Sequence, residues 1–532
     1  MDFISTRFPY RQTNYFSKIL LDYLDHVEGI KPFYAHAPSL QGIQKAIAAR
    51  EKFPTQRKIL VEELKRQYAG NASPATGKNI KALLEENTFT ITTAHQPNIF
   101  TGPLYFIYKI LHAIKLAEHC KASFPQYNFV PVYYMGSEDA DLDELGHIYL
   151  GGQAIEWKTK QTGAVGRMEV DKEFISLIDL ISGQLSVLPF GHNMLSRLRN
   201  CYQRGVLIQD ATFKLVNALF ADYGLIVLIP DNAAFKKQAI KIFEDDLLNE
   251  TPSAIVEKTA GRLHAAGYRL QANPREINLF YLKDKMRDRI IKKNSEFRIL
   301  NSELKFSESD LMKELLTHSE RFSPNVILRG IFQETILPNI VYIGGGGEIA
   351  YWLQLKDLFE NYKVPYPVLL LRNSFLVVEK KWQERISKLS FTSEDFFLPE
   401  EELIRRLVAR QTKNEIKLNG NFTDAEKLYD SLKKQVVAID STLGQHVEAL
   451  KTQSIYRLQE LEKKMLRAEK RKFTDEQRQI HTIKENLFPK NSLQERIENV
   501  MYYYSKWGTD FIQNVYQHSL GLEEEFVILS ES

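Results

Sequence analysis

Residues 88–120 read TFTITTAHQPNIFTGPLYFIYKILHAIKLAEHC, and this stretch decides the fold class. Seven residues rich in β-branched side chains lead into a loop, and apolar residues at helical spacing follow the loop. A strand that passes through a short loop into a helix is one βα unit. Because such units assemble into parallel sheets with helices on their faces, the stretch predicts an α/β protein.

Further apolar runs of strand length continue this pattern. They are FVPVYYM (129–135), LIVLI (225–229), PNIVYIG (338–344) and PVLLL (367–371), with helical patterns at 208–223, 233–249 and 348–360 between several of them. The alternation predicts a doubly wound parallel sheet. The strands are unevenly spaced, so we expect inserted segments to interrupt the sheet.

Beyond Phe375 the chain becomes charged, poor in glycine and helical. Apolar residues there recur in steps of three, four and seven: Leu428, Leu432, Val436, Ile439, Leu443, Leu450, Leu458, Leu461, Met465 and Ala468. This spacing indicates a coiled-coil seam. We expect a homodimer through the seam, and packing of the helix on its own domain is the alternative. Thr474 and Asp475 can cap a further helix, which makes a helical hairpin possible.

The composition excludes several classes of protein. With 532 residues, 44% of them hydrophobic and 26% charged, the chain has the make-up of a folded globular protein with two or three units. Its 70 basic and 67 acidic residues nearly cancel, which disfavours nucleic acid as a partner. No signal peptide and no run of about 20 apolar residues is present, so a membrane partner is not expected.

Only two cysteines occur, Cys120 and Cys201. Such sparse thiols fit a reducing compartment and exclude both a disulfide framework and a Cys-rich zinc site. We therefore expect a cytoplasmic protein.

Polar residues follow the first strand at the edge of the sheet where open α/β folds bind ligands. His95 and Gln96 come directly after it, and Thr101 or Gly102 can cap the next helix, whose first turn suits Pro103. The free amides of such a helix start would attract an anion. His95 is thus a candidate donor to a phosphate or carboxylate, with a plain hydrogen-bonding role in the loop as the alternative.

The segment GSEDADLDELGH (136–147) follows the second strand and is dense in titratable groups. They are Glu138, Asp139, Asp141, Asp143, Glu144 and His147. Carboxylates so close together repel one another unless a cation is near, which predicts a pocket for a substrate amine with one carboxylate as base. For Asp143 and Glu144 a solvated helix start is the favoured interpretation. The spacing matches no zinc signature, and no metal is predicted.

Four glycines, Gly344 to Gly347, separate a predicted strand from a helix that starts near Glu348. The backbone can approach a phosphate closely there, although a tight turn is the alternative because neither GxGxxG nor a P-loop is present. Asn325 and Arg329 lie upstream, and Arg372 ends a strand. Either arginine can bind a carboxylate or phosphate bidentately, or pair with one of the many acids of the chain.

Near the end of the chain, a basic and aromatic group of residues offers a weaker candidate, a second nucleotide site. Its members are Lys490, Arg496, Tyr502, Tyr503 and Tyr504. Aromatic packing of a returning helix against the core is the favoured alternative.

Seven segments together resemble the bacillithiol biosynthesis cysteine-adding enzymes. They are HQPNIFTGPLYFIYKI (95–110), GSEDADLDELGH (136–147), TGAVGRM (162–168), GYRLQANPREINLFYL (267–282), FSPNVILRGIFQETILPNIVYIGGGGEIAYWLQL (322–355), PYPVLLLRNSF (365–375) and LFPKNSLQERIENVMYYY (487–504). They stand in family order and span roughly Thr93 to Tyr504. Their joint occurrence is specific, whereas no single segment is.

The resemblance implies a Rossmann-like core of the class I aminoacyl-tRNA synthetase kind, with connecting-peptide insertions and a dimerising coiled-coil domain. The expected parts are the first half of the core at 1–154, a first insertion at 155–207, core at 208–250, a second insertion at 251–330, the end of the core at 331–378, the coiled-coil domain at 379–488, and a helix and strand packing back on the core at 489–532.

The implied reaction condenses cysteine with glucosaminyl malate, and the amide formed at the sugar nitrogen completes bacillithiol, a low-molecular-weight thiol. Amide formation requires an activated carboxyl, so an ATP-derived adenylate or acyl phosphate is a reasonable intermediate, with ATP or ADP as the candidate nucleotide ligand and no cofactor assigned. Two residues depart from the family pattern: Ala140 stands where His is usual, and His95 where Gln is common.

The residues expected in the site fall into three groups. Catalytic roles fall to His95, Glu138, Asp139 and Asp141; binding of substrate or nucleotide to Gln96, Thr101, Gly102, Asn325, Arg329, Gly345, Gly346, Glu348 and Arg372; and the second nucleotide site to Arg496, Tyr503 and Tyr504. Two alternatives stay open, a nucleotidyl- or acyl-transferase of the same fold acting on another amine, and a coiled-coil scaffold that binds a metabolite without turnover.

Overall fold

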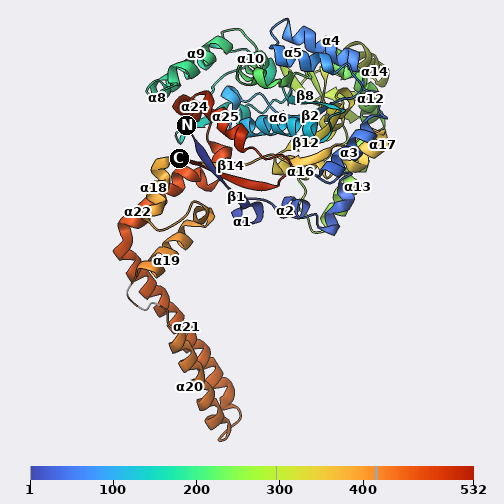
Figure 1. Ribbon diagram of the computed structural model, residues 1–532. Coiled ribbons are helices and arrows are strands. Elements are labelled where there is room, and N and C mark those ends of the chain that lie inside the picture. Colours follow the sequence, from blue (N-terminus) through green and yellow to red (C-terminus); the bar gives the residue numbers. More distant parts are fainter. Residues whose placement is uncertain (1, 295, 413, 415–416) are drawn as a thin grey trace. The chain divides into compact units, whose positions relative to one another are not determined.

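The computed structural model describes residues 2–294, 296–412, 414 and 417–532 (Figure 1). It divides into two compact units. Residues 1–377 and 492–532 form the core unit, and residues 378–491 form the helical unit. Over the described residues, no helix combines the length and the apolarity needed to cross a bilayer.

A five-stranded parallel sheet lies at the centre of the core unit, and it confirms the predicted fold class. Its strands are β2 (Thr88–His95), β3 (Asn128–Met135), β6 (Ile226–Leu228), β12 (Asn339–Gly344) and β13 (Val368–Leu371). They lie in the order β13-β12-β2-β3-β6, and each neighbouring pair is parallel. Numbered along the chain this order is 5-4-1-2-3. In this doubly wound arrangement the second and third strands lie on one side of the first strand, and the fourth and fifth lie on its other side; this change of side is called the chain reversal below.

Helix α6 (Tyr105–Ser123) connects β2 to β3 and buries Ile107, Ile110 and Leu111 against the sheet. The prediction that Thr101 or Gly102 caps this helix is wrong. Thr101 instead ends a short 3-10 turn (Ile99–Thr101) with a positive φ of 73°, and Leu104 takes the N-cap position without a side-chain cap.

Long insertions separate the later strands, as the uneven spacing predicted. Between β3 and β6 lie α7 (Leu142–Leu145), the hairpin β4 (His147–Leu150) and β5 (Gln153–Glu156), α8 (Lys172–Leu185), α9 (Gly191–Cys201) and α10 (Ile208–Phe220). Between β6 and β12 lie α11 (Ala233–Lys236), α12 (Ile240–Asn249), α13 (Thr251–Ala265), α14 (Glu308–Thr317) and α15 (Val326–Ile336). The exact domain boundaries stay a prediction.

The second insertion also carries a five-stranded sheet of its own. Its antiparallel order is β10-β9-β8-β7-β11, built from β7 (Leu279–Lys283), β8 (Met286–Lys293), β9 (Glu296–Ile299), β10 (Lys305–Phe306) and β11 (Phe322–Pro324). Phe280 of β7 and Arg287 of β8 line the pocket described below.

The two termini of the chain share a small sheet in the order β1-β15-β14. Strand β1 (Phe3–Pro9) pairs antiparallel with β15 (Glu525–Glu531), and β14 covers Phe375–Val378. The segment that closes the core unit contributes α23 (Gln494–Ile497), α24 (Val500–Trp507) and α25 (Thr509–His518). The N-terminal helices are α1 (Tyr10–Thr13), α2 (Lys18–Leu24), α3 (Leu40–Arg50), α4 (Arg57–Tyr68) and α5 (Pro74–Ala82), and α16 (Gly346–Trp352) and α17 (Lys356–Tyr362) connect β12 to β13.

The helical unit is dominated by α20 (Asn419–Val437) and α21 (Leu443–Lys470), which run side by side (Figure 1). Their ion pairs join Lys433 to Glu448 at 2.8 Å and Asp430 to Lys451 at 2.7 Å, so the pair is an antiparallel hairpin. The hairpin turn at 438–442 interrupts the predicted seam and leaves Ile439 in the turn.

The remaining helices of this unit are α18 (Lys380–Lys388), α19 (Glu400–Gln411) and α22 (Thr474–Leu487). The sequence predicted a cap at Thr474 and Asp475, but both residues lie inside the first turn of α22 and its N-cap position has no side-chain cap. The possible hairpin was thus placed one helix too late.

A buried ion pair fixes α3 to the start of β12. Arg50 and Glu334 are fully buried and 2.7 Å apart, and Arg50 also donates to the Asn339 carbonyl at 2.8 Å. The Asn339 side chain in turn donates to Glu334 at 2.8 Å. Burial raises the pKa of Glu334, and the charge of Arg50 opposes that rise. The network places the first residue of β12 beside β2.

Glu334→Gln should lower the free energy of unfolding by about 3 kcal/mol, because Arg50 would then lie buried without a counter-charge. Urea denaturation of both proteins measures the loss. The matched control is Glu360→Gln, which breaks the exposed pair with Lys356 and should cost less than about 1 kcal/mol. Equal losses in the two variants would contradict the structural importance of the buried pair.

Candidate active site

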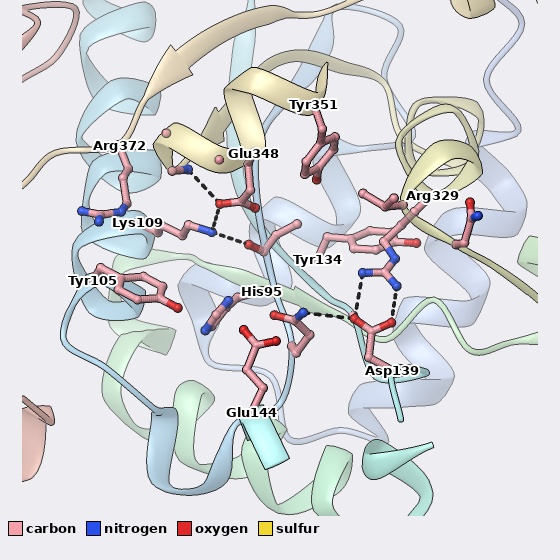
Figure 2. Close-up of a pocket in the computed structure, with 18 of the residues that line it drawn as sticks. His95, Tyr105, Lys109, Tyr134, Asp139, Glu144, Arg329, Glu348, Tyr351 and Arg372 are labelled. Atoms are coloured by element: carbon pink, nitrogen blue, oxygen red, sulfur yellow. Dashed lines mark hydrogen bonds and ion pairs between the residues drawn. The ribbon is translucent and has the colours of Figure 1, made fainter. Parts of the chain in front are cut away.

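A cavity of about 480 Å³ lies at the carboxyl ends of the central strands (Figure 2). Residues 94–96 at the end of β2 and residues 345–348 after β12 line it from the two sides of the chain reversal. Gly136, Asp139 and Glu144 line it from the segment after β3. This is the position where doubly wound sheets bind ligands, because the loops on either side of the reversal diverge and leave a crevice.

The cavity brings together ten of the sixteen expected site residues, and Glu144 and Gly347, which the sequence placed in the acidic segment and the glycine run, line it as well. The ten are His95, Gln96, Asp139, Asn325, Arg329, Gly345, Gly346, Glu348, Arg372 and Arg496. Six others do not line it: Thr101, Gly102, Glu138, Asp141, Tyr503 and Tyr504. Lining residues that the sequence analysis missed include Tyr105, Lys109, Tyr134, Phe280, Arg287 and Tyr351.

Asp139 is paired with two arginines from the second insertion. Arg329 binds its carboxylate through both terminal nitrogens, one of them at 2.9 Å, and Arg287 lies 3.6 Å away. Burial favours the protonated acid, but the two guanidinium groups outweigh it and hold the pKa of Asp139 below its usual range. Asp139 is therefore ionised and already neutralised, and such a group is suited to orienting Arg329 rather than to accepting a proton.

Glu138 does not line the cavity, contrary to the predicted catalytic role. Its buried carboxylate forms an ion pair with Lys236 and accepts a hydrogen bond from Ser323 at 3.3 Å. Burial raises the pKa of Glu138, although Lys236 opposes the rise. Asp141 is also unavailable as a pocket base, because it caps α7 by accepting the backbone N–H of Glu144 at 3.2 Å.

Two cationic side chains in the cavity wall have partners of their own. Lys109 donates to the Ala94 carbonyl at 2.8 Å and forms an ion pair with Glu348, as Figure 2 shows. Arg372 forms a buried ion pair with Glu495 at 2.7 Å and lies 4.9 Å from the Tyr105 ring centre. The alternative of structural pairing, considered for Arg372 at the outset, therefore describes both cations.

His95 lies in the cavity wall with an unpaired ring nitrogen. Only 8% of the residue is exposed, and among the described residues its Nε2 has no hydrogen-bond partner. Burial, and then the positive charges of Lys109 and Arg372, lower the pKa of His95 well below the ordinary value. The imidazole is therefore neutral at physiological pH and can donate or accept one hydrogen bond to a ligand.

The glycine run serves close packing as well as the pocket. Gly345 takes the N-cap position of α16 in extended backbone, and its N–H donates to the Glu348 carboxylate at 2.7 Å. A Cβ on Gly346 would lie 2.8 Å from the Leu20 side chain. The run thus lets α2 approach this loop while it exposes backbone to the cavity.

The aromatic residues predicted for a second nucleotide site pack inside the core unit instead. Tyr503 stacks on Phe511 with ring centres 5.3 Å apart, and the Tyr504 hydroxyl donates to Asn193 at 3.2 Å. Of that group, Arg496 alone lines the cavity among the described residues. The structure therefore favours the packing interpretation for the tyrosines.

Both cysteines are free and buried. Burial raises the pKa of Cys120 to about 12 and that of Cys201 to about 11, so neither thiol is a reactive nucleophile at neutral pH. Over the described ranges, no group of three His, Cys, Asp or Glu side chains is arranged to hold a metal ion.

Comparisons with known proteins agree with this architecture. Two family models match the chain: "Bacillithiol biosynthesis BshC, N-terminal Rossmann-like domain" over residues 4–373, and the C-terminal coiled-coil domain of the same family over residues 375–531. A Flavobacterium psychrophilum protein named "Putative cysteine ligase BshC" is 38% identical over 527 residues, 98% of this chain and 99% of its own length. A relative of the same name from Cytophaga hutchinsonii is 38% identical over 94% of each chain.

A crystal structure described as a "putative arginyl t-RNA synthetase" from Campylobacter jejuni also aligns with the chain. It is 11% identical, covers 84% of this chain and 98% of its own, and has a TM-score of 0.21. A score this low carries no argument about either fold or function.

Asp139→Asn should destabilise the protein by about 3 kcal/mol at neutral pH, because Arg329 and Arg287 would lose their shared counter-charge. The folded-state pKa of Asp139 is lowered, so its stabilisation is complete above the unfolded value of about 4 and disappears as the pH falls through the folded value. The gap in unfolding free energy between wild type and variant should therefore be constant from pH 5 to 8 and shrink in acid.

Urea denaturation at several pH values measures this gap. The control is Asp143→Asn, an exposed carboxylate four residues away, which should change stability by less than about 0.5 kcal/mol. A gap that stays constant in acid would contradict the assigned ionisation of Asp139.

Proposed function

Because the chain belongs to the bacillithiol biosynthesis BshC family, we propose that it joins the carboxyl group of cysteine to the amino group of glucosaminyl malate. Ligase activity and a place in bacillithiol biosynthesis come with the family, and the resemblance drawn from the seven segments is confirmed. One observation carries the proposal: the cavity between β2 and β12 is lined by both acidic and basic side chains, so a single ligand can contact both.

The arrangement of charges suits a substrate with an anionic and a cationic end. Lys109 and Arg372 are neutralised by Glu348 and Glu495, but Arg496 has no ion pair among the described residues. A malate carboxylate bound by Arg496 would therefore supply the charge that this side of the cavity lacks. The neutral His95 imidazole can hydrogen-bond a hydroxyl or carbonyl group between the two ends.

The chemistry requires an activated form of cysteine. In our proposal ATP supplies an acyl phosphate or acyl adenylate of the cysteine carboxyl. The sugar nitrogen attacks the carbonyl carbon, the C–N bond forms, and the bond to the phosphate or nucleotide oxygen breaks with its electron pair. The two buried thiols take no part in this scheme, and free cysteines support a cytoplasmic location.

Purified protein supplied with cysteine, glucosaminyl malate and ATP should form a product with the mass of bacillithiol, and omitting any of the three should abolish it. Mass spectrometry of the reaction measures the product. Condensation of cysteine with other amines at equal rates would favour the transferase alternative, and binding of the substrates without turnover would favour the scaffold.

The same assay tests the placement of the substrate. Arg496→Ala should raise the KM for glucosaminyl malate about tenfold or more, since a charge-assisted hydrogen bond contributes roughly 1.5–3 kcal/mol. Arg199→Ala is the control, because Arg199 pairs with Asp179 on the exposed surface of the core unit. An unchanged KM in Arg496→Ala would refute the placement of the substrate's anionic end at Arg496.

We further propose that the protein is a homodimer through its coiled coil. Packing of α20 on α21 leaves large apolar side chains exposed, among them Leu428 (57%), Leu450 (40%) and Leu461 (47%). Isolated apolar residues on a surface are ordinary, but a row of them along one hairpin is typical of a helical interface. A second copy of the hairpin would cover this row.

Light scattering of the wild-type protein should give twice the chain mass of 61.7 kDa, and the double variant Leu428→Glu, Leu461→Glu should give the chain mass itself. Charges placed on the row would be buried without partners in the dimer. Leu180→Glu, at a residue 60% exposed in the core unit, should stay dimeric. A monomeric wild type would contradict the proposal.

A further inference from the structure

Of the carboxylates that line the cavity, one has no partner among the described residues. Asp139 is bound by Arg329 and Arg287, and Glu348 is bound by Lys109. Glu144 also lines the cavity, yet no hydrogen bond or ion pair of its side chain occurs among the described residues. Arg496 is its cationic counterpart, so the cavity offers one free negative and one free positive group.

The turn that carries Glu144 is fixed by local contacts. Helix α7 is a single turn, Asp141 accepts the Glu144 N–H at 3.2 Å, and Leu145 is fully buried. Gly146 ends the turn where a Cβ would lie 2.7 Å from the Leu142 carbonyl oxygen. The Glu144 carboxylate consequently faces the His95 ring across the cavity, as Figure 2 shows.

The surroundings of Glu144 favour a bound cation. The residue is exposed at the open cavity, and partial desolvation of its carboxylate, followed by the negative charges of Asp141 and Asp139, raises the pKa of Glu144 above its usual value. Both influences disfavour an unpaired carboxylate and would be relieved by a ligand ammonium group. His95 offers no charge of its own, because its imidazole is neutral.

We propose that Glu144 binds the amino group of the acceptor substrate and removes its proton, an inference that rests on the proposed function. The ammonium group gives one proton to the Glu144 carboxylate, which becomes a carboxylic acid. The nitrogen lone pair is thereby freed to attack the activated carboxyl of cysteine, and the second proton that the nitrogen loses as the amide forms passes to the departing phosphate or nucleotide. Glu144 thus takes the base role that the sequence assigned to Glu138, Asp139 or Asp141, each of which is committed to a contact within the protein.

Binding measurements isolate this contact from turnover. Calorimetry should compare glucosaminyl malate with glucosyl malate, which has a hydroxyl in place of the amine, on full-length wild type and Glu144→Gln. The variant should bind glucosaminyl malate at least tenfold more weakly and glucosyl malate within twofold of wild type. Equal effects on both ligands, or no effect on either, would overturn the assignment.

Turnover tests the proton transfer. Glu144→Gln should reduce kcat/KM for glucosaminyl malate about 100-fold at pH 7, the lower end for loss of a general base. The loss should shrink as the pH rises and the amine deprotonates in solution. A variant with wild-type kcat/KM at pH 7, or a loss independent of pH, would refute the base role.

Asp143→Asn, on the same turn but outside the cavity lining, is the matched control and should keep wild-type binding and turnover. The two proposals fail separately. Absence of bacillithiol from the wild-type reaction would reject the proposed function, while the binding comparison would still decide whether Glu144 recognises an amine.

Discussion

The reversal of strand order between β2 and β12 is the constraint on which the other features of this protein depend. Both strands run parallel and pair directly, but the connections that follow them diverge. No helix can cover the carboxyl ends at that point, so a crevice stays open. The buried Arg50, Glu334 and Asn339 network fixes the first residue of β12 beside β2 and thereby sets the position of the crevice.

Charge pairing decides what that crevice can do. A buried charge without a partner is costly, so most of the ionisable groups there are matched within the protein: Asp139 with two arginines, Lys109 with Glu348, and Arg372 with Glu495. These pairs connect the sheet, the second insertion and the closing segment of the chain around the cavity. Glu144 and Arg496 are the exceptions. Both residues are exposed, so solvent can hydrate their charges until a ligand that carries both signs of charge binds.

The side chains of the site are suited to binding and positioning a substrate and not to forming a covalent intermediate with it. Its imidazole is neutral, its most buried acid is permanently paired, and the two thiols are buried in the interior. Such a site suits a condensation in which the substrate carboxyl arrives activated and the protein has to align an amine with it and accept a proton. The helical unit contributes an antiparallel hairpin with an exposed apolar row, a separate feature suited to association.

The sequence by itself determined the five central strands, because four of them are continuous apolar runs, as expected of strands buried on both faces, and β2 is rich in β-branched residues. It also placed His95, Asp139 and the glycine run at one sheet edge, since parallel strands end together. Only the tertiary structure decided which acid is free: Lys236 lies 98 residues from Glu138 and Arg329 lies 190 residues from Asp139, so no local pattern reveals these partners. The same holds for Leu104, whose N–H donates to the Glu498 carbonyl in place of the expected cap, because pairing across the chain depends on distances that folding alone creates.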